Sequence, residues 1–457
     1  MYENFILQTI RRRVEIKPRH DFNPYTLDSL SSLPSQLAKP LQEMCQLAYT
    51  NLASTTMTFS SHQLQSLSEA VKEDYLGLMT TFIEYDEEKY QFLHLTIQEF
   101  LAAWWIAKHE KKTVKVFKDY FDDDHFRICL RFVAGLTHLK HQSYQKYFNK
   151  QLDLQCKTKP LLGFDCYYFN CLSSFYQDPT KRKFNHLNSD DDIFNALTSL
   201  FIQVQLLYES QNTTLCQALA QSINNHSLCL YRVSLSLFDW LCLSYCINNS
   251  NTTWNHLHLG HMSNQSLSVF TAGLTNNSLQ TQCKRLEIEL INEPTDEIIH
   301  KFLQSSLLYN IEECCCGLSI GRYFPCHVYL LQFLKLPQLK ILDLKIDCPT
   351  MPAVFVDGDA AKCSELEKCI AINTKLWKVK ITYRGLPSTI ISSVVRGVTK
   401  NKAITSLTLC VNFRDNIPIP PLPDGVIEQL LKDNNTLQAL SLDIPDELLP
   451  SSLNIVE

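Results

Sequence analysis

Apolar residues in the first half of the chain recur at steps of three and four, the spacing of a helix with one buried face. The clearest case is residues 93–108, whose apolar face consists of Leu93, Ile97, Phe100, Leu101 and Trp104. Gln98, Glu99 and Lys108 fall on other faces of this helix, so the apolar face is the one predicted to be buried. The same spacing predicts further helices over residues 5–14, 41–47, 59–71, 126–136 and 197–207.

A different pattern begins after Asn248, where a nine-residue template of Asn-x-x-apolar-x-x-apolar-x-apolar recurs. Four copies begin at Asn251, Asn373, Asn401 and Asn434. Three more copies have another residue in the first position, and their apolar positions start at Cys283, Cys315 and Leu339. Residues 298–303, 391–398 and 426–431, which lie between these copies, have helical spacing.

Short strands that alternate with helices at intervals of about 30 residues are typical of a leucine-rich-repeat solenoid. In such a solenoid, parallel strands line the concave face and helices line the convex face. We therefore expect seven parallel strands, with centres near Leu257, Leu286, Leu318, Leu342, Val379, Leu407 and Leu440. The alternative is an α/β fold without repeats, because two intervals, of 24 and 37 residues, depart from the average.

These patterns divide the chain into four segments. Residues 1–34 are a helix and an irregular link, since Pro18, Pro24 and Pro34 interrupt the pattern. Residues 35–108 and 109–248 are two mainly helical domains, although residues 141–192 have no pattern that assigns them. Residues 249–457 are the repeats, about seven and degenerate, so the expected fold class is multidomain: a mostly α-helical region followed by an α/β solenoid.

Composition excludes several classes of protein. The 42 basic and 47 acidic residues nearly cancel, so no strong positive field attracts nucleic acid. The 18 cysteines are scattered through apolar segments and are expected to be buried free thiols. The apolar run 234–247 is too short to span a bilayer and contains Asp239, and the first residues do not have the order of a secretory signal. We expect a cytoplasmic protein without a membrane span.

Residues 90–103, YQFLHLTIQEFLAA, resemble a signature of the winged-helix domain in animal NOD-like receptors, the NACHT and leucine-rich-repeat family. Similar pieces occur in the family's order at residues 1–14, 33–49, 126–136, 206–219 and 236–247, directly before the repeats. The resemblance implies that residues 35–108 form a winged-helix-like domain. It also implies a helical domain over 109–248 and repeats of the ribonuclease-inhibitor type.

The sequence departs from this family at two points. It has only 11 glycines and contains no Gly-x-x-x-x-Gly-Lys-Ser/Thr phosphate loop, so the NACHT ATPase module is missing from it. The family's repeats also place an asparagine three residues beyond the last apolar strand position, and here only Asn412 fits. The other positions hold Met262, Ile291, Tyr323, Asp347, Arg384 and Pro445.

His94 is the candidate cofactor-binding residue, because the resemblance places it where a winged-helix histidine contacts the phosphates of ADP. A single imidazole supplies too few hydrogen-bond donors for a polyphosphate. We therefore expect His94 to be hydrogen-bonded at the start of its helix, and the chain to have no cofactor. ATP or ADP would bind only together with an upstream NACHT module, and the chain itself should not bind ADP with micromolar affinity.

Other clusters are weaker candidates. His256, His258 and His261 lack a neighbouring cysteine or carboxylate in sequence to complete a tetrahedral metal site, so no metal is expected. Cysteines 314, 315, 316 and 326 contain no Cys-x-x-Cys pair, which favours core thiols. Residues 122–125, DDDH, fit a solvated helix start better than a calcium loop, and residues 11–13 are three arginines that favour a role over an apolar surface.

No catalytic constellation with interpretable spacing is present, so we do not expect an enzyme. The favoured interpretation is the ligand-recognition and regulatory part of an intracellular innate-immune receptor, a scaffold for signal transduction. Its concave repeat face would bind a protein or microbial ligand, and a full-length relative would oligomerise. The alternative is a stand-alone leucine-rich-repeat adaptor or inhibitor of one protein partner.

Overall fold

Residues 1–151 and 197–215 form one unit of the computed structural model, and residues 152–196 and 216–457 form the other. Both units mix helices with strands. The structure describes residues 2–16, 23–65, 67–69, 71, 76–121, 123–142, 144, 146, 190–223, 226–230, 235–274, 281–291, 295–319, 326–347, 360–384, 388–412 and 422–443. Most of the stretch 141–192, which had no assignable pattern, lies outside these residues.

The amino-terminal unit is built around one buried helix, α5. Its helices are α1 (Tyr2–Ile16), α2 (Ser35–Ala53), α3 (Ser61–Gln65), α5 (Leu95–Lys108), α6 (Glu110–Tyr120) and α7 (Arg127–Thr137). Helices α2 and α7 both pack against α5, and Arg131 of α7 binds Glu209 of α10 (Asp190–Ser210) at 2.7 Å. The predicted helices at 5–14, 93–108, 126–136 and 197–207 are confirmed. The helix predicted over residues 41–47 is longer and begins directly after Pro34.

The helix predicted over residues 59–71 is wrong at its start. Thr58–Ser60 is strand β1, and it pairs antiparallel with β3 (Glu87–Phe92), which in turn pairs with β2 (Met79–Glu84). Phe59 is buried, and its ring lies 5.6 Å from that of Phe92. This pairing partner is about 30 residues away in the sequence, and local helical spacing does not reveal it.

Helix α5 is buried on more sides than its sequence predicted. Gln98 and Glu99, which the spacing places off the apolar face, are only 2% and 4% exposed, whereas Leu93 of the predicted apolar face precedes the helix and is 46% exposed. Gln98 donates a hydrogen bond to the backbone carbonyl of Thr56 at 3.1 Å. Burial raises the pKa of Glu99 to about 7, because the ionised form loses hydration, and the charge of Arg131 opposes this shift. A helix that packs on two neighbouring helices and a sheet has no free polar face.

The raised pKa of Glu99 predicts a pH-dependent stability. An acid whose pKa is higher in the folded than in the unfolded state stabilises the fold at low pH, and this contribution is lost as pH rises through about 7. Glutamine resembles the protonated acid. Glu99→Gln should therefore raise the free energy of unfolding by about 2 kcal/mol at pH 8, and the gain should shrink towards zero near pH 4.5.

Urea unfolding at several pH values checks this expectation. The matched control is Glu87→Gln, because Glu87 is an exposed glutamate on β3 of the same unit. Its substitution should change stability by less than about 0.5 kcal/mol at any pH. A gain for Glu99→Gln that is the same at pH 5 and pH 8 would contradict burial as the cause.

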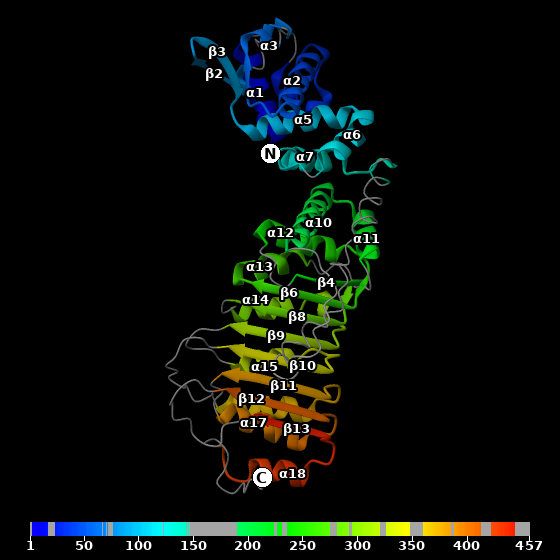
Figure 1. Cartoon of the computed structure of the whole chain (residues 1–457), viewed down its shortest axis with the longest axis vertical. Helices are drawn as coiled ribbons and strands as arrows, with labels where there is room; N and C mark the ends of the chain where they lie inside the picture. Colours follow the sequence, from blue (N-terminus) through cyan, green and yellow to red (C-terminus); the bar gives the residue numbers. More distant parts are fainter. Residues whose placement is uncertain are drawn as a thin grey trace. The chain divides into compact units, whose positions relative to one another are not determined.

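The carboxyl-terminal unit contains an eight-stranded sheet of order β13-β12-β11-β10-β9-β8-β6-β4, in which every neighbouring pair is parallel (Figure 1). Its strands are β4 (Ser227–Cys229), β6 (His256–Met262), β8 (Arg285–Leu290), β9 (Glu313–Ser319), β10 (Ile341–Asp347), β11 (Lys378–Arg384), β12 (Ser406–Asn412) and β13 (Ala439–Asp443). The short strands β5 (Thr253–Trp254) and β7 (Gln282–Cys283) also pair in parallel. The prediction of seven consecutive parallel strands is confirmed, and β4 adds an eighth.

The register of the third predicted strand is wrong. The template placed its inward positions at Cys315, Leu318 and Ile320, but β9 aligns Cys314 with both Leu286 and Leu342. The three template positions of this strand are therefore Ile311, Cys314 and Cys316, all buried, and Leu318 further along the same strand is buried as well. In this register Ile288, Cys316 and Leu344 follow one another at intervals of 28 residues, which removes the anomalous interval of 24.

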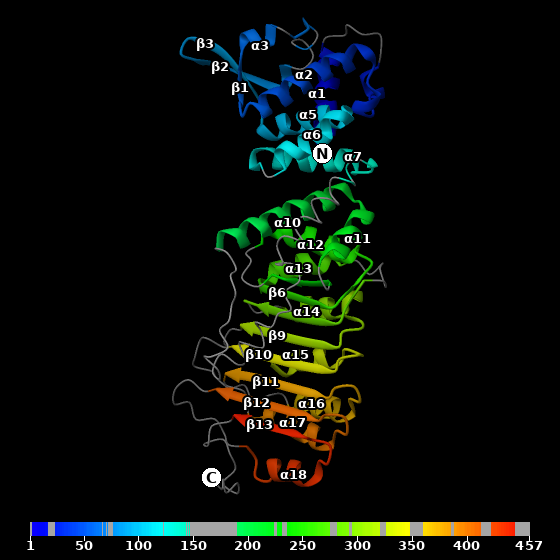
Figure 2. The same ribbon diagram turned by 45° about the vertical axis from the view of Figure 1, so that its right-hand side comes forward.

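Helices connect the strands and lie along one side of the sheet (Figure 2). They are α11 (Thr213–Ser222), α12 (Leu237–Asn248), α13 (Asn264–Gly273), α14 (Asp296–Leu303), α15 (Cys326–Leu334), α16 (Ala360–Ile372), α17 (Ser388–Lys400) and α18 (Val426–Asp433). From α12 onward, each helix packs against the next. The apolar strand positions, such as Leu257, Leu342 and Leu407, are fully buried and form the core with these helices.

Two of the asparagines that begin the template, Asn401 and Asn434, join successive units. The Asn401 side chain donates to the carbonyls of Ile370 and Asn373, both at 2.7 Å, and accepts from the amides of Ala403 and Ile404 at 2.6 and 2.7 Å. Asn434 repeats this arrangement one unit later, donating to Val398 and Asn401 and accepting from Thr436 and Leu437. The template asparagine thus satisfies backbone groups in two turns at once.

Candidate functional site

The sheet has a polar face opposite its helices. The side chains of a strand alternate between two faces, so the residues between the buried positions lie on the second face. One row across it consists of His258, Glu287, Cys315, Asp343, Lys380, Thr408 and Ser441. We call this row and the flanking residues His256, Arg285, Glu313 and Lys378 the polar face.

Glu287 is the centre of a charged cluster at one end of the polar face. Its Oε1 lies 2.6 Å from a guanidinium nitrogen of Arg285 and 3.3 Å from Nε2 of His256. The rings of His256 and His258 are parallel, with centroids 6.3 Å apart. Burial acts to raise the pKa of Glu287, but the hydrogen bond and charge of His256, with the charge of Arg285, lower it overall. Glu287 is therefore an anion at neutral pH.

Asp343 and Lys380 form a second charged pair near the middle of the polar face. The Lys380 ammonium lies 3.2 Å from Oδ2 of Asp343, and both side chains are about four-fifths buried. Oδ1 of Asp343 and Oε2 of Glu287 are buried and have no hydrogen-bond partner in the described part of the chain. Each of these oxygens is an acceptor that a ligand's donor would satisfy.

Between the two carboxylates lies Cys315, the third member of the row. Burial raises the pKa of its thiol to about 12, so the thiol stays protonated near neutral pH and is a poor nucleophile. Cys314 and Cys316 point to the opposite, apolar face and are buried. The three consecutive cysteines therefore do not gather at one point.

His94 lies outside this site, at the start of α5. Its Nδ1 accepts a hydrogen bond from the backbone amide of Thr96 at 3.2 Å and lies 2.8 Å from the Thr96 hydroxyl. The imidazole thus caps the helix, as expected, and it is exposed. Its contact with a nucleotide remains a prediction from the resemblance.

The other candidates from the sequence do not gather at one site. Several of them instead form hydrogen bonds with nearby backbone groups. His261 is exposed, whereas His256 and His258 are buried. Asp123 accepts from the backbone amide of His125 at 2.9 Å, which is the helix-start role expected for the acidic run. Arg11 donates to the carbonyl of Leu27.

Among the described residues, no three His, Cys, Asp or Glu side chains converge in a geometry that could hold a metal ion. Within the same ranges, no helix combines the length and apolar composition needed to cross a bilayer. Comparisons of the sequence with protein-family models and with curated proteins found no match.

The sequence patterns singled out His256, His258 and Cys315 of the polar face but not its charged pairs. The patterns also gave the apolar positions of each strand, but Glu287, Asp343 and Lys380 were not singled out. They occupy the single polar position between the last two apolar positions of their templates, as in Leu-Asp343-Leu. Once strands are in register, that position always falls on the second face, so the signal was available.

Proposed function

We propose that this chain is the ligand-recognition and regulatory part of a NOD-like receptor, and that its parallel sheet is the strand layer of a leucine-rich-repeat solenoid. Support comes from the parallel register of consecutive strands, the 28-residue intervals and the asparagines that link neighbouring turns. In solenoids of this kind the strand face binds partners over a broad surface. The polar face would then be the recognition surface for a protein or microbial ligand, in the cytoplasm.

The amino-terminal unit is consistent with this proposal. The chain runs through α2, β1, α3, the hairpin of β2 and β3, and α5, which is the order of elements expected for a winged-helix domain with one wing. Residues 90–103, on which the resemblance to the family rests, form β3 and the start of α5. In the proposed role this unit regulates an ATPase module in a full-length relative, and the chain itself is not catalytic.

The observation that carries the proposal is the pair of unpartnered carboxylate oxygens, Oε2 of Glu287 and Oδ1 of Asp343, in one row of the polar face. A buried acceptor without a donor costs roughly 1–3 kcal/mol in the free protein. A ligand that donates hydrogen bonds to both oxygens recovers that cost on binding.

The test compares affinity capture by the wild-type chain with capture by the double variant Glu287→Gln and Asp343→Asn, which keeps side-chain shape. The control is Asp424→Asn with Asp433→Asn, two exposed aspartates without a role in the polar face. We expect partners recovered by wild type and control to fall at least tenfold with the polar-face variant, at unchanged circular dichroism. Equal recovery by all three proteins would refute recognition by this face.

A further inference from the structure

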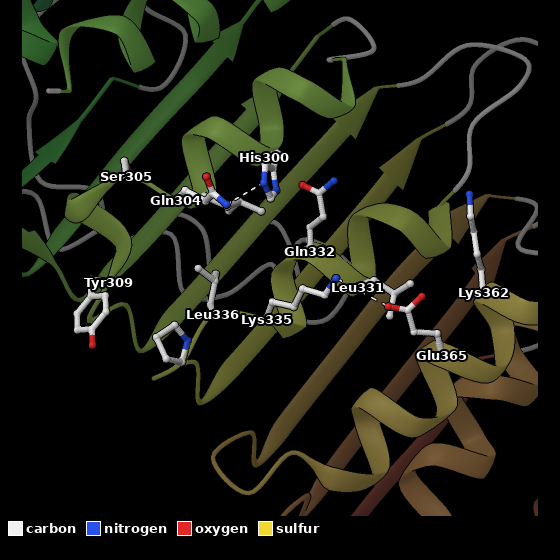
Figure 3. A pocket seen from close by; sticks show the side chains of 12 residues that line it. His300, Gln304, Ser305, Tyr309, Leu331, Gln332, Lys335, Leu336, Lys362 and Glu365 are labelled. Carbon is white, nitrogen blue, oxygen red and sulfur yellow. Dashed lines mark hydrogen bonds and ion pairs between the residues drawn. The ribbon is translucent and has the colours of Figure 1, made fainter. Parts of the chain in front are cut away.

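A groove of about 700 Å³ lies on the helical side of the carboxyl-terminal unit, between α14, α15 and α16 (Figure 3). It is therefore on the opposite side of the sheet from the polar face. Its volume is within the range of sites that bind small ligands or short peptides, roughly 300–1,000 Å³. Its floor is apolar and consists of Leu303, Leu331, Leu336 and Pro337.

Two buried polar atoms line this groove without a hydrogen-bond partner. Ser305 is 4% exposed, and its hydroxyl has no partner. Oε1 of Gln332 is likewise buried and unpartnered, and in Figure 3 the Gln332 side chain extends between α14 and α15. A hydroxyl and an amide oxygen left in this state penalise the free protein. Together they offer a donor for a ligand's carbonyl and an acceptor for a ligand's N–H, the two groups of a peptide bond.

The charged side chains of the groove leave an excess of positive charge. Lys335 lies 3.8 Å from Glu365, and both are more than half exposed. Lys362 also lines the groove, is exposed, and has no ion-pair partner in the described part of the chain. His300 accepts a hydrogen bond from the amide of Gln304 at 2.7 Å, which holds its ring in place at the rim. With two lysines and one glutamate, the lining of the groove carries a net positive charge, which favours a ligand that has a carboxylate.

A second groove of about 500 Å³ continues along the same side, between α13 and α14. It shares Gln304 with the first groove and has Leu274 and Ile298 among its lining residues, and its one lysine, Lys301, is paired with Glu297 at 2.7 Å. The two grooves together follow the row of helices from α13 to α16. A surface whose apolar lining continues along a row of helices fits a chain-like ligand better than a compact one.

We propose that this pair of grooves binds an acidic, extended peptide segment of a protein partner. Backbone N–H and carbonyl groups of the peptide pair with Gln332 and Ser305, and its carboxylates contact Lys335 and Lys362. Apolar side chains of the peptide cover the leucine floor. This site is independent of the polar face, so the chain would hold two partners at once, one on each side of its sheet.

Selection of a phage-displayed random dodecapeptide library on the wild-type chain tests the proposal. We expect enriched peptides that combine Asp or Glu with Leu, Ile or Phe. A fluorescently labelled copy of the most enriched peptide is then titrated by fluorescence polarisation. Lys335→Glu with Lys362→Glu should weaken its binding at least tenfold, and 0.5 M salt should weaken binding to wild type. Lys402→Glu with Lys432→Glu, two exposed lysines outside the grooves, is the matched control and should bind as wild type does.

Gln332→Leu separates a binding role from a structural one. Leucine removes the unpartnered amide, so the melting temperature should stay equal or rise, while peptide affinity should fall by at least fivefold. The polar-face variant of Glu287 and Asp343 should bind the peptide normally, which distinguishes this proposal from the proposed function. Enriched peptides without acidic residues, or equal binding by the Lys335 and Lys362 variant, would overturn it. Equal affinity for a single-stranded oligonucleotide of the same charge would overturn it too.

Discussion

Replacing Phe100 by Ala is expected to lower the free energy of unfolding of the amino-terminal unit by about 3–5 kcal/mol, the loss typical of truncating a buried aromatic residue. Phe100 lies on α5 and is 5% exposed. Its ring contacts that of Phe132 edge to face, with centroids 5.4 Å apart, and lies 5.9 Å from that of Tyr2. The substitution thus removes contacts between α5, α7 and α1 and leaves a cavity among three helices.

Urea unfolding, monitored by circular dichroism and by tryptophan fluorescence, measures this loss. The matched control is Phe5→Ala, because Phe5 on α1 belongs to the same unit but is 43% exposed. We expect the control to lose less than about 1.5 kcal/mol, since a large part of its side chain already contacts water. A loss below about 1 kcal/mol for Phe100→Ala would show that α5 is not the central helix of this unit.

The sequence predicted the strands and their register best where the residues of each strand were enough to fix them. The strands around Val379, Leu407 and Leu440 were predicted correctly, and their register is the one that the template aligned. In each of these units an asparagine marks the turn before the strand, so the template had a fixed starting point. The parallel direction followed from the helices between strands.

The third strand shows why such a pattern becomes ambiguous. Both Cys315-Leu318-Ile320 and Ile311-Cys314-Cys316 fit the three apolar positions, and neither set has a leading asparagine. The choice depends on pairing with β8 and β10 on either side, because a strand between two others has one register that buries its apolar residues in line with theirs. This constraint arises only when the sheet assembles, so the residues of the third strand alone do not reveal it.

The burial of Glu99 and the strand position of Phe59 also depend on packing against segments that are distant in the sequence. A charged residue on a helix face is normally solvated, and the sequence around Glu99 gives no sign that neighbouring helices cover it. Phe59 has helical spacing to later apolar residues, but it is buried by a strand that forms near Tyr90. At the polar face the reverse holds: alternation alone places Asp343 and Lys380 there, and a sequence analysis that followed the second face as well as the first would have found them.

Asn401→Ala is expected to lower the free energy of unfolding of the carboxyl-terminal unit by about 2–4 kcal/mol. Asn401 is 2% exposed and makes four hydrogen bonds, two to carbonyls of the preceding unit and two from amides of its own turn. Alanine leaves these backbone groups unsatisfied in a buried site, where each costs roughly 1 kcal/mol or more. Water cannot easily replace them without opening the contact between turns.

A second substitution separates the contribution of the amide's accepting oxygen from that of its donating nitrogen. Asn401→Asp keeps an oxygen that accepts from Ala403 and Ile404, but it directs a second oxygen at the carbonyls of Ile370 and Asn373. Because acceptors then face acceptors, Asn401→Asp should be at least as destabilising as Asn401→Ala above the pKa of the carboxyl. Asn435→Ala, at an exposed position, is the control and should cost less than about 0.5 kcal/mol. If chemical denaturation showed Asn401→Asp to be as stable as wild type, the hydrogen bonds between turns would not hold neighbouring units together.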